Sequence, residues 1–207
     1  MEDDNISQAQ PEKSRSFLRG ALAYIGELIR VVVISLAIIL PIRYFLVQPF
    51  YVKGASMEPN FYDHEYLIID ELSYRLRNPQ RGEVVVFRYP RDPSQFFIKR
   101  VVGLPGESIE IKNQKLKIKN AETPKEFILE EPYLEADLNL YGEYTATLGP
   151  NEYYLLGDNR ASSLDSRQFG PLKESLIVGR VWLRGWPVER AARFTAPDYS
   201  IYVQENN

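Results

Sequence analysis

The segment Phe96–Val102 reads FFIKRVV, and its side chains alternate between the two faces of an extended strand. Phe97, Lys99 and Val101 fall on the same face, so an amine lies between two apolar side chains. An amine held among apolar groups loses hydration, which lowers its pKa and leaves it neutral and basic near physiological pH. Lys99 is therefore a candidate general base, with an ordinary edge-strand charge as the alternative interpretation.

Further β-type segments lie on both sides of this strand, separated by turn residues such as Gly, Pro and Asn. The expected strands are Tyr66–Asp70, Glu83–Phe87, Phe96–Val102, a hairpin that turns at Asn113 and Gln114, Tyr153–Leu156 and Leu176–Leu183. Residues 121–142 are polar and irregular, which is typical of a surface insertion. The pattern predicts a mostly β fold whose main domain, residues 50–195, is a compact, partly closed, β-barrel-like structure.

Length and charge exclude several classes of protein. A chain of 207 residues holds one domain of ordinary size plus an appendage. It has 25 basic and 28 acidic residues and a net charge of -3, which argues against an extended nucleic-acid interface. It has no cysteine, so disulfides and thiolate metal sites are excluded.

An apolar stretch precedes the β domain and predicts one N-terminal transmembrane helix. Its uninterrupted centre, Val31–Ile42, is bounded by Arg30 and Arg43. A helix needs about 20 residues to cross a bilayer, so a span near Ile25–Phe45 requires both arginines to reach toward the membrane surface. The expected organisation is a disordered tail at residues 1–20, a transmembrane anchor region at 21–49, the β-rich domain at 50–195 and a C-terminal tail at 196–207.

Two alternatives compete with a permanent anchor. A cleavable signal peptide would need a site with small residues two positions apart, and residues 41–45 offer none. A buried core helix is the other, and we favour the anchor because Val31–Ile42 is apolar all round. Lys13, Arg15 and Arg19 precede the span and few basic residues directly follow it, which predicts a cytoplasmic N-terminus. The β domain would then lie on the trans face of the membrane, extracytoplasmic or lumenal.

A turn of small residues, Gly54–Pro59, follows the apolar stretch and contains Ser56. A serine hydroxyl becomes an effective nucleophile only when a neighbouring base accepts its proton. The one histidine, His64, lies in a polar patch shortly after this turn, and sequence alone does not return it to the serine. We therefore pair Ser56 with Lys99, although an ordinary turn serine is the simpler interpretation of Ser56 taken alone.

Four segments stand out together: Gly54–Pro59, Arg81–Phe87, Phe97–Glu107 and Gly157–Arg167. In this order, behind one N-terminal span, they resemble the type I signal peptidases, also called leader peptidases. The resemblance covers about residues 25–185. It implies a membrane-anchored serine endopeptidase, a hydrolase that removes N-terminal signal peptides from exported precursor proteins after small residues, at A-x-A type sites, with a Ser-Lys dyad.

The resemblance also implies roles for individual residues. Ser56 would be the nucleophile, Lys99 the general base, and the Ser163 hydroxyl would hydrogen-bond the lysine and orient it. The other supporting residues implied are Asp158, Asn159, Asp165 and Arg167. The substrate-binding positions, which line two shallow pockets for small residues, match Phe50, Val52 and Ile98. Ordinary core packing is the alternative for the last three.

The sequence departs from the family pattern at three places beside the nucleophile. Gly54 stands where some relatives carry a serine that donates to the oxyanion, so the expected donor is the backbone N–H of Ser56, worth about 3 kcal/mol. Asn60 replaces the usual threonine after the proline, and Glu58 adds an acid next to the site. The dyad is complete despite these changes.

The resemblance implies neither a cofactor nor a metal. The expected partners are the signal peptides of exported precursors and membrane lipid, and not nucleic acid. A soluble, self-cleaving Ser-Lys protease of the repressor type is one rival, but it would need a DNA-binding module, and the apolar stretch from Ala21 argues against one. The other rival is an anchored β domain that binds exported chains without cutting them, and it would not need Ser56 and Lys99.

Overall fold

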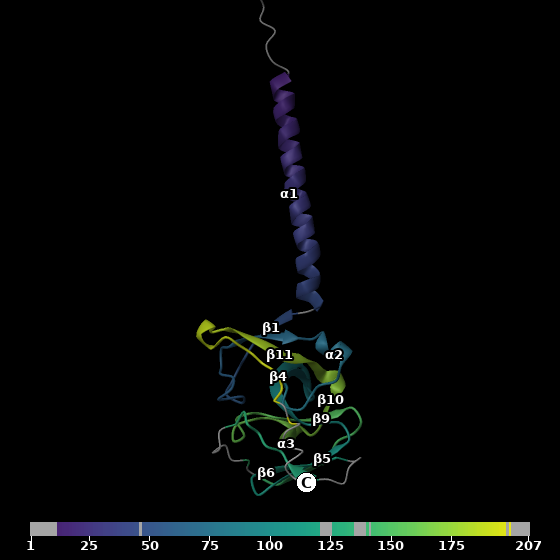
Figure 1. Cartoon of the computed structure of the whole chain (residues 1–207), viewed down its shortest axis with the longest axis vertical. Helices are drawn as coiled ribbons and strands as arrows, with labels where there is room; N and C mark the ends of the chain where they lie inside the picture. The colour runs from purple at the N-terminus through teal and green to yellow at the C-terminus, as the bar shows by residue number, and fades with distance from the viewer. Residues whose placement is uncertain are drawn as a thin grey trace, which may run out of the picture. The chain divides into compact units, whose positions relative to one another are not determined.

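A computed structural model of the chain describes residues 12–45, 47–120, 126–134, 140, 142–197 and 199. The chain divides into two units, Met1–Tyr44 and Phe45–Asn207. Helix α1 (Glu12–Phe45) begins within the expected N-terminal tail (Figure 1). All its side chains from Tyr24 to Leu40 are exposed. No helix in the described ranges combines the length and the apolarity needed to cross a membrane. The expected transmembrane helix is therefore not confirmed.

The second unit contains two antiparallel sheets. The larger has the order β1-β2-β11-β3-β4-β9-β10, with β12 paired to β11. Its strands are β1 (Val47–Tyr51), β2 (Tyr66–Asp70), β3 (Val84–Tyr89), β4 (Asp92–Gly103), β9 (Glu152–Leu156), β10 (Leu172–Lys173), β11 (Ile177–Trp186) and β12 (Ala192–Arg193). The smaller has the order β7-β6-β5-β8. Its strands are β5 (Glu107–Lys112), β6 (Lys115–Asn120), β7 (Glu126–Ile128) and β8 (Tyr144–Thr147).

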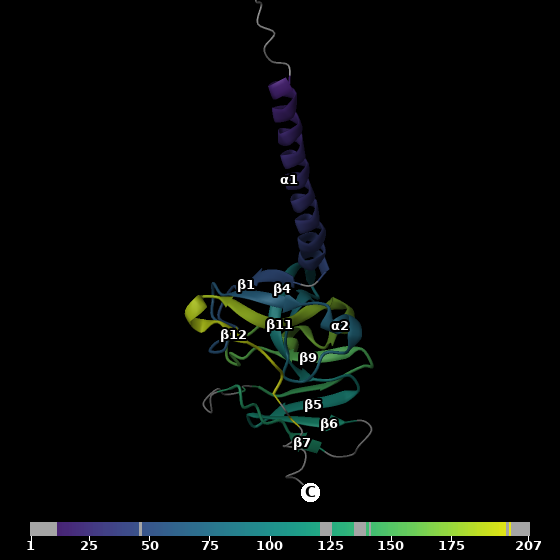
Figure 2. The same ribbon diagram turned by 45° about the horizontal axis from the view of Figure 1, so that its top comes forward.

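The smaller sheet is built on the expected hairpin. Asn113 and Gln114 connect β5 to β6 with φ angles of 52° and 62°, the two positive values that a two-residue type I′ turn requires. In both views β5 and β6 lie at the end of the unit away from β1 (Figure 1 and Figure 2). The short helices are α2 (Ser73–Leu76), α3 (Ser166–Phe169) and the 3-10 turns η1 (Glu174–Leu176) and η2 (Val188–Arg190).

The mostly β fold class is confirmed, and every expected strand is present, although β4 begins earlier, at Asp92, and β11 ends later, at Trp186, than expected. The barrel-like closure is not confirmed, because β1 and β10 end the larger sheet and no pairing among the described strands joins them. Strand β7 lies inside the segment expected to be irregular. Residues 121–125, 135–139 and 141 of that segment, and residues 1–11, 198 and 200–207 of the expected tails, lie outside the described residues.

Strand β3 is buried on both faces, which places it at the centre of the unit. Val84 and Val86 belong to one buried cluster, which also contains Met57 from the loop after β1. The alternating residues Val85 and Phe87 belong to a second cluster formed with β4 and β9. Strand β3 pairs with β4 along one edge and packs against Met57 of the loop after β1 through Val84 and Val86. The core therefore brings β4 and this loop together.

Candidate active site

Ser56 lies in a sharp turn that leaves the end of strand β1. Val52, just after the strand, is buried in the core. Gly54 has a φ of 86°, a conformation that glycine adopts without steric cost, and its N–H donates to Asp63 Oδ1 at 3.0 Å. Met57 is fully buried and so fixes the turn directly after Ser56. The serine is thus held between two residues anchored in the core.

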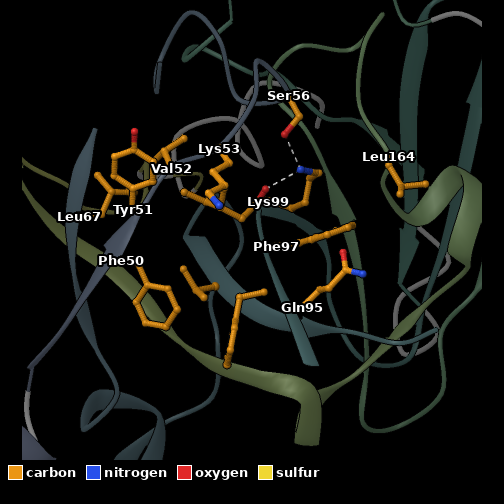
Figure 3. Close-up of a pocket in the computed structure, with 13 residues that line it drawn as sticks. Phe50, Tyr51, Val52, Lys53, Ser56, Leu67, Gln95, Phe97, Lys99 and Leu164 are labelled. Atoms are coloured by element: carbon orange, nitrogen blue, oxygen red, sulfur yellow. Dashed lines mark hydrogen bonds between the residues drawn. The ribbon is translucent and has the colours of Figure 1, made fainter. Parts of the chain in front are cut away.

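Lys99 comes from β4, where it pairs with Val85 of the central strand. It is 3% exposed, and its Nζ lies 2.7 Å from Ser56 Oγ. The same Nζ donates to the Ile98 carbonyl at 2.7 Å. Figure 3 shows the hydroxyl and the amine facing each other at one end of a groove. The two residues that the sequence pairs are therefore in direct contact.

Burial lowers the pKa of Lys99 from its ordinary value of 10.5 to about 8. The negative charges of Asp165 and Asp158 raise this pKa, but desolvation is the larger effect. An appreciable fraction of the amine is therefore unprotonated near neutral pH, where it can accept the Ser56 proton.

The one histidine is poorly placed to act as a base. His64 is 74% exposed, and its Nδ1 lies 3.0 Å from Asp63 Oδ2. Within the described structure it makes no contact with Ser56. Since a general base must lie within hydrogen-bond reach of the proton it accepts, the geometry favours Lys99.

Asn159 joins the Gly157–Arg167 segment to the serine turn. Its backbone N–H donates to the Ser56 carbonyl at 3.1 Å, and its Nδ2 donates to the Ala55 carbonyl at 3.1 Å. These two bonds fix the main chain on either side of the nucleophile. Asn159 therefore acts on the position of Ser56 from a distant part of the sequence.

Asp158 is fully buried and pairs with Arg100, the residue after Lys99. Arg100 donates from Nε to Oδ1 at 2.8 Å and from Nη2 to Oδ2 at 2.6 Å, a two-point ion pair of fixed orientation. Asn60 Nδ2 donates to the same carboxylate at 2.9 Å. The carboxylate of Asp158 thus connects β4 with the serine turn.

Asp165 and Arg167, two of the expected supporting residues, form an ion pair with each other. Arg167 donates from Nε to Oδ1 and from Nη2 to Oδ2 of Asp165, both at 2.8 Å. The same carboxylate accepts the Gly157 N–H at 3.1 Å and caps the start of α3 by accepting the Arg167 N–H at 3.2 Å. The pair therefore closes the loop that contains Ser163.

Ser163 is buried, but its Oγ makes no hydrogen bond within the described part of the chain. The expected bond to Lys99 is thus not formed in this structure. The Ser163 side chain lies against Gly157 instead, close to the main chain of Ser56. It is adjacent to the nucleophile turn and keeps a free hydroxyl.

A groove of about 570 Å³ extends from the Ser56–Lys99 contact between β1 and β4. The expected substrate-binding residues Phe50, Val52 and Ile98 all line it, and Figure 3 labels the first two. The other lining residues are Tyr51, Lys53, Leu67, Val86, Gln95, Phe96, Phe97 and Leu164. Most of these side chains are apolar, so the groove suits small uncharged side chains beside the reacting pair.

Several residues that shape the site were not expected from the sequence. Arg100 lies in the same strand as Lys99 and, by strand alternation, on the opposite face, so the sequence pattern indicates its direction. No sequence pattern indicates a role for Tyr133 or Glu131. The Tyr133 carbonyl accepts from Asn60 at 2.8 Å, its ring lies 3.8 Å from the Arg100 guanidinium carbon, and Arg160 donates to Glu131 at 2.6 Å.

The arrangement suits nucleophilic attack on a carbonyl group. A hydroxyl touches a buried amine of lowered pKa, and the backbone N–H of Ser56 makes no hydrogen bond within the described residues. That N–H could donate to a developing oxyanion. Among the described residues no cluster of three or more His, Asp or Glu side chains could hold a metal ion.

Comparison with known proteins identifies relatives over most of the chain. The model of the family described as signal peptidase, peptidase S26, matches residues 25–186. A probable signal peptidase I-2 of Synechocystis sp. is 34% identical over 175 residues, which cover 82% of this chain and 77% of the relative. Signal peptidase IB of Staphylococcus aureus is 34% identical over 173 residues, which cover 75% of this chain and 86% of the relative.

A solved structure is also similar. The crystal structure of a signal peptidase I from Enterococcus faecalis is 30% identical, covers 51% of this chain and 97% of its own, and gives a TM-score of 0.43. The sequence relationships define the protein as a serine endopeptidase, a hydrolase of signal peptide processing. The chain belongs to the signal peptidase family, peptidase S26.

Proposed function

We propose that this endopeptidase removes N-terminal signal peptides from exported precursor proteins by cutting after small residues, at A-x-A type sites, with a Ser56–Lys99 dyad. The observation that carries the proposal is the 2.7 Å contact between Lys99 Nζ and Ser56 Oγ. Membership of the signal peptidase family supports the substrate class.

In this mechanism Ser56 Oγ attacks the carbonyl carbon of the scissile bond while its proton passes to Lys99 Nζ. The oxyanion that forms accepts a hydrogen bond from the Ser56 N–H, a type of donor worth about 3 kcal/mol. Lys99 then protonates the leaving amine, the C–N bond breaks, and the mature protein departs with a new N-terminus. Water attacks the acyl-enzyme with Lys99 as base, which releases the signal peptide as a carboxylate and returns the proton to Ser56.

The substrate segment would bind extended in the groove between β1 and β4, with main-chain hydrogen bonds to a free strand edge. Alternate side chains would enter two small pockets lined by Phe50, Val52 and Ile98. The apolar walls favour Ala at these positions and exclude large or charged side chains, because a buried charge without a partner is strongly unfavourable.

The supporting residues would act by holding the dyad in place. Asn159 fixes the serine turn, Asp158 links it to β4, and Asp165 with Arg167 closes the loop around Ser163. We assign Ser163 the role of orienting Lys99 during the reaction, which its buried and unpaired hydroxyl permits. A catalytic pair held within a fraction of an ångström of its reactive geometry needs such a frame.

We propose further that residues 21–49 anchor the enzyme as a single-pass membrane protein with a cytoplasmic N-terminus and the catalytic domain on the trans face. The exposed apolar side chains of α1, which include Ile25, Val32 and Ile39, support contact with lipid. The basic residues before them support the orientation. In sealed inside-out vesicles, added protease should remove only the N-terminal tail, and digestion of the domain from Tyr51 onward would contradict the topology.

The decisive experiment uses a purified precursor with one Ala-x-Ala site. Mass measurement of the products should give a single cut after the second alanine. Ser56→Ala and Lys99→Met should abolish the cut, while His64→Gln, which changes an exposed ring, should keep it. A wild-type protein that binds the precursor and leaves it intact would instead support the binding-only alternative.

A further inference from the structure

The substrate groove contains a second cation besides Lys99. Lys53 lines the groove and is exposed, and the described residues offer it no ion-pair partner. Every other lining residue is uncharged. When Lys99 is neutral, as the proposed mechanism requires, Lys53 is the one remaining charge among the described lining residues.

The direction in which Lys53 faces follows from the strand before it. Val52 is 4% exposed and belongs to the core, whereas its neighbours Tyr51 and Lys53 are exposed. The Val52 N–H donates to the Glu65 carbonyl at 2.9 Å, so the pairing between β1 and the segment before β2 continues as far as Val52. Because side chains of an extended segment alternate, the Lys53 side chain leaves the main chain on the side opposite to Val52. Since Lys53 lines the groove and is exposed, its ammonium lies at the open, solvent-facing rim of the groove.

A bound substrate would alternate in the same way. If the two small residues of a small-x-small site enter the pockets lined by Val52 and Ile98, the residue between them points away from the pockets, toward the solvent-facing rim of the groove. Lys53 lies at that rim. A carboxylate at the middle position would be attracted by the Lys53 ammonium, and a basic side chain there would be repelled.

We propose that Lys53 is a specificity-determining residue that favours precursors with Asp or Glu at the middle position of the small-x-small cleavage site. The inference rests on the proposed function of signal peptide removal. Because Lys53 is exposed, the preference should be modest, about 2- to 5-fold in kcat/KM for Glu over Gln.

Three peptides that differ only in this middle residue, Glu, Gln or Lys, test the proposal. The wild-type enzyme should cut them in the order Glu, Gln, Lys, as measured by kcat/KM. Lys53→Met should make the three values converge, and Lys53→Glu should reverse the order. Lys115→Met, which removes an exposed lysine from β6 far outside the groove lining, should keep the wild-type order.

Salt gives an independent readout. The wild-type preference should shrink as ionic strength rises from about 0.05 M to about 1 M, where the screening length falls to roughly 3 Å. Equal Glu-to-Lys ratios for the wild type and Lys53→Met would overturn the role of Lys53 while leaving the proposed function intact. Failure of the wild-type enzyme to cut any of the three peptides would contradict the proposed function itself.

Discussion

Gly157 leaves no room for a side chain on the face that it turns to Ser163. A methyl group at Gly157 would overlap Ser163 Oγ and would lie 2.5 Å from both Ser163 Cβ and the Ser56 carbonyl oxygen. Such separations are far inside van der Waals contact. The absence of a side chain at this position allows the serine turn and the loop that contains Ser163 to lie against each other.

Gly157→Ala should therefore lower kcat/KM by about 100-fold, because a displacement of about 1 Å is sufficient to misalign a catalytic pair. The added methyl should also destabilise the fold by about 1–3 kcal/mol through overpacking. Gly185→Ala is the matched control, since no atom of a neighbouring segment lies within 4 Å of where the new Cβ would stand and the φ of Gly185 is not positive. Full activity in a folded Gly157→Ala protein would show that the contact is unimportant.

Ser163→Ala should lower turnover strongly and leave thermal unfolding nearly unchanged. The Ser163 Oγ has no hydrogen-bond partner in the described structure, so its removal leaves no buried group unsatisfied. The expected loss arises because Ser163 bonds Lys99 only during the reaction. The neighbouring exposed serine, in Ser162→Ala, controls for the substitution itself. Wild-type kcat in Ser163→Ala would rule out the orienting role.

Asp158→Asn should shift the acidic limb of kcat/KM to lower pH. The Asp158 charge raises the pKa of Lys99, so its neutralisation lowers that pKa further. It should also destabilise the protein by about 3 kcal/mol, because buried Arg100 loses its charged partner. Asp70→Asn breaks a partly exposed Asp-Arg pair with Arg180, on strands β2 and β11, and should leave the pH limb in place. An equal pH limb in wild type and Asp158→Asn would contradict the electrostatic coupling.

The sequence was informative where local periodicity determines structure. Alternation in Phe96–Val102 predicted a strand with Lys99 on an apolar face, and the Asn113-Gln114 pair predicted a hairpin turn. It was uninformative where contacts join distant irregular segments. Glu131 and Tyr133 lie in a polar stretch without a period, and their bonds to Arg160 and Asn60 depend on the folded arrangement.

Strand β1 illustrates a second limit. Val47–Tyr51 contains glutamine and proline, so it has no strand pattern of its own, and it becomes a strand by pairing with β2 at the edge of the sheet. The pairing of Ser56 with Lys99 could be proposed from residue types, but their 2.7 Å separation depends on both core clusters around β3.

Activity should rise with pH through an ionisation near 8. Lys99 accepts the Ser56 proton only when its amine is neutral, and burial lowers its pKa to about 8. The acidic limb of kcat/KM reports this ionisation in the free enzyme. His64→Gln should leave the limb unchanged, and Lys99→Ala should abolish cleavage. A folded Lys99→Ala protein that still cuts, beside an inactive His64→Gln protein, would overturn the Ser-Lys mechanism.

The same burial predicts how stability depends on pH. Well below pH 8 Lys99 is almost fully protonated in both the folded and the unfolded protein, and the lowered pKa means that the buried ammonium destabilises the folded state by about 3 kcal/mol, at about 1.4 kcal/mol per pKa unit. Between about pH 8 and 10.5 the folded protein loses this proton while the unfolded chain retains it, so the free energy of unfolding rises with pH.

Lys99→Met replaces the amine with an apolar side chain of similar length and removes this titration. In denaturant unfolding, the stability of Lys99→Met relative to wild type should fall by about 3 kcal/mol between about pH 7 and pH 11, because the wild-type protein is relieved of its buried charge over that range while the variant does not titrate at this position. Because the two proteins share all the tyrosines and all the other lysines, the effect of those groups on stability cancels when the two are compared at the same pH. A difference that stays constant from pH 7 to 11 would mean that the pKa of Lys99 is not lowered by folding.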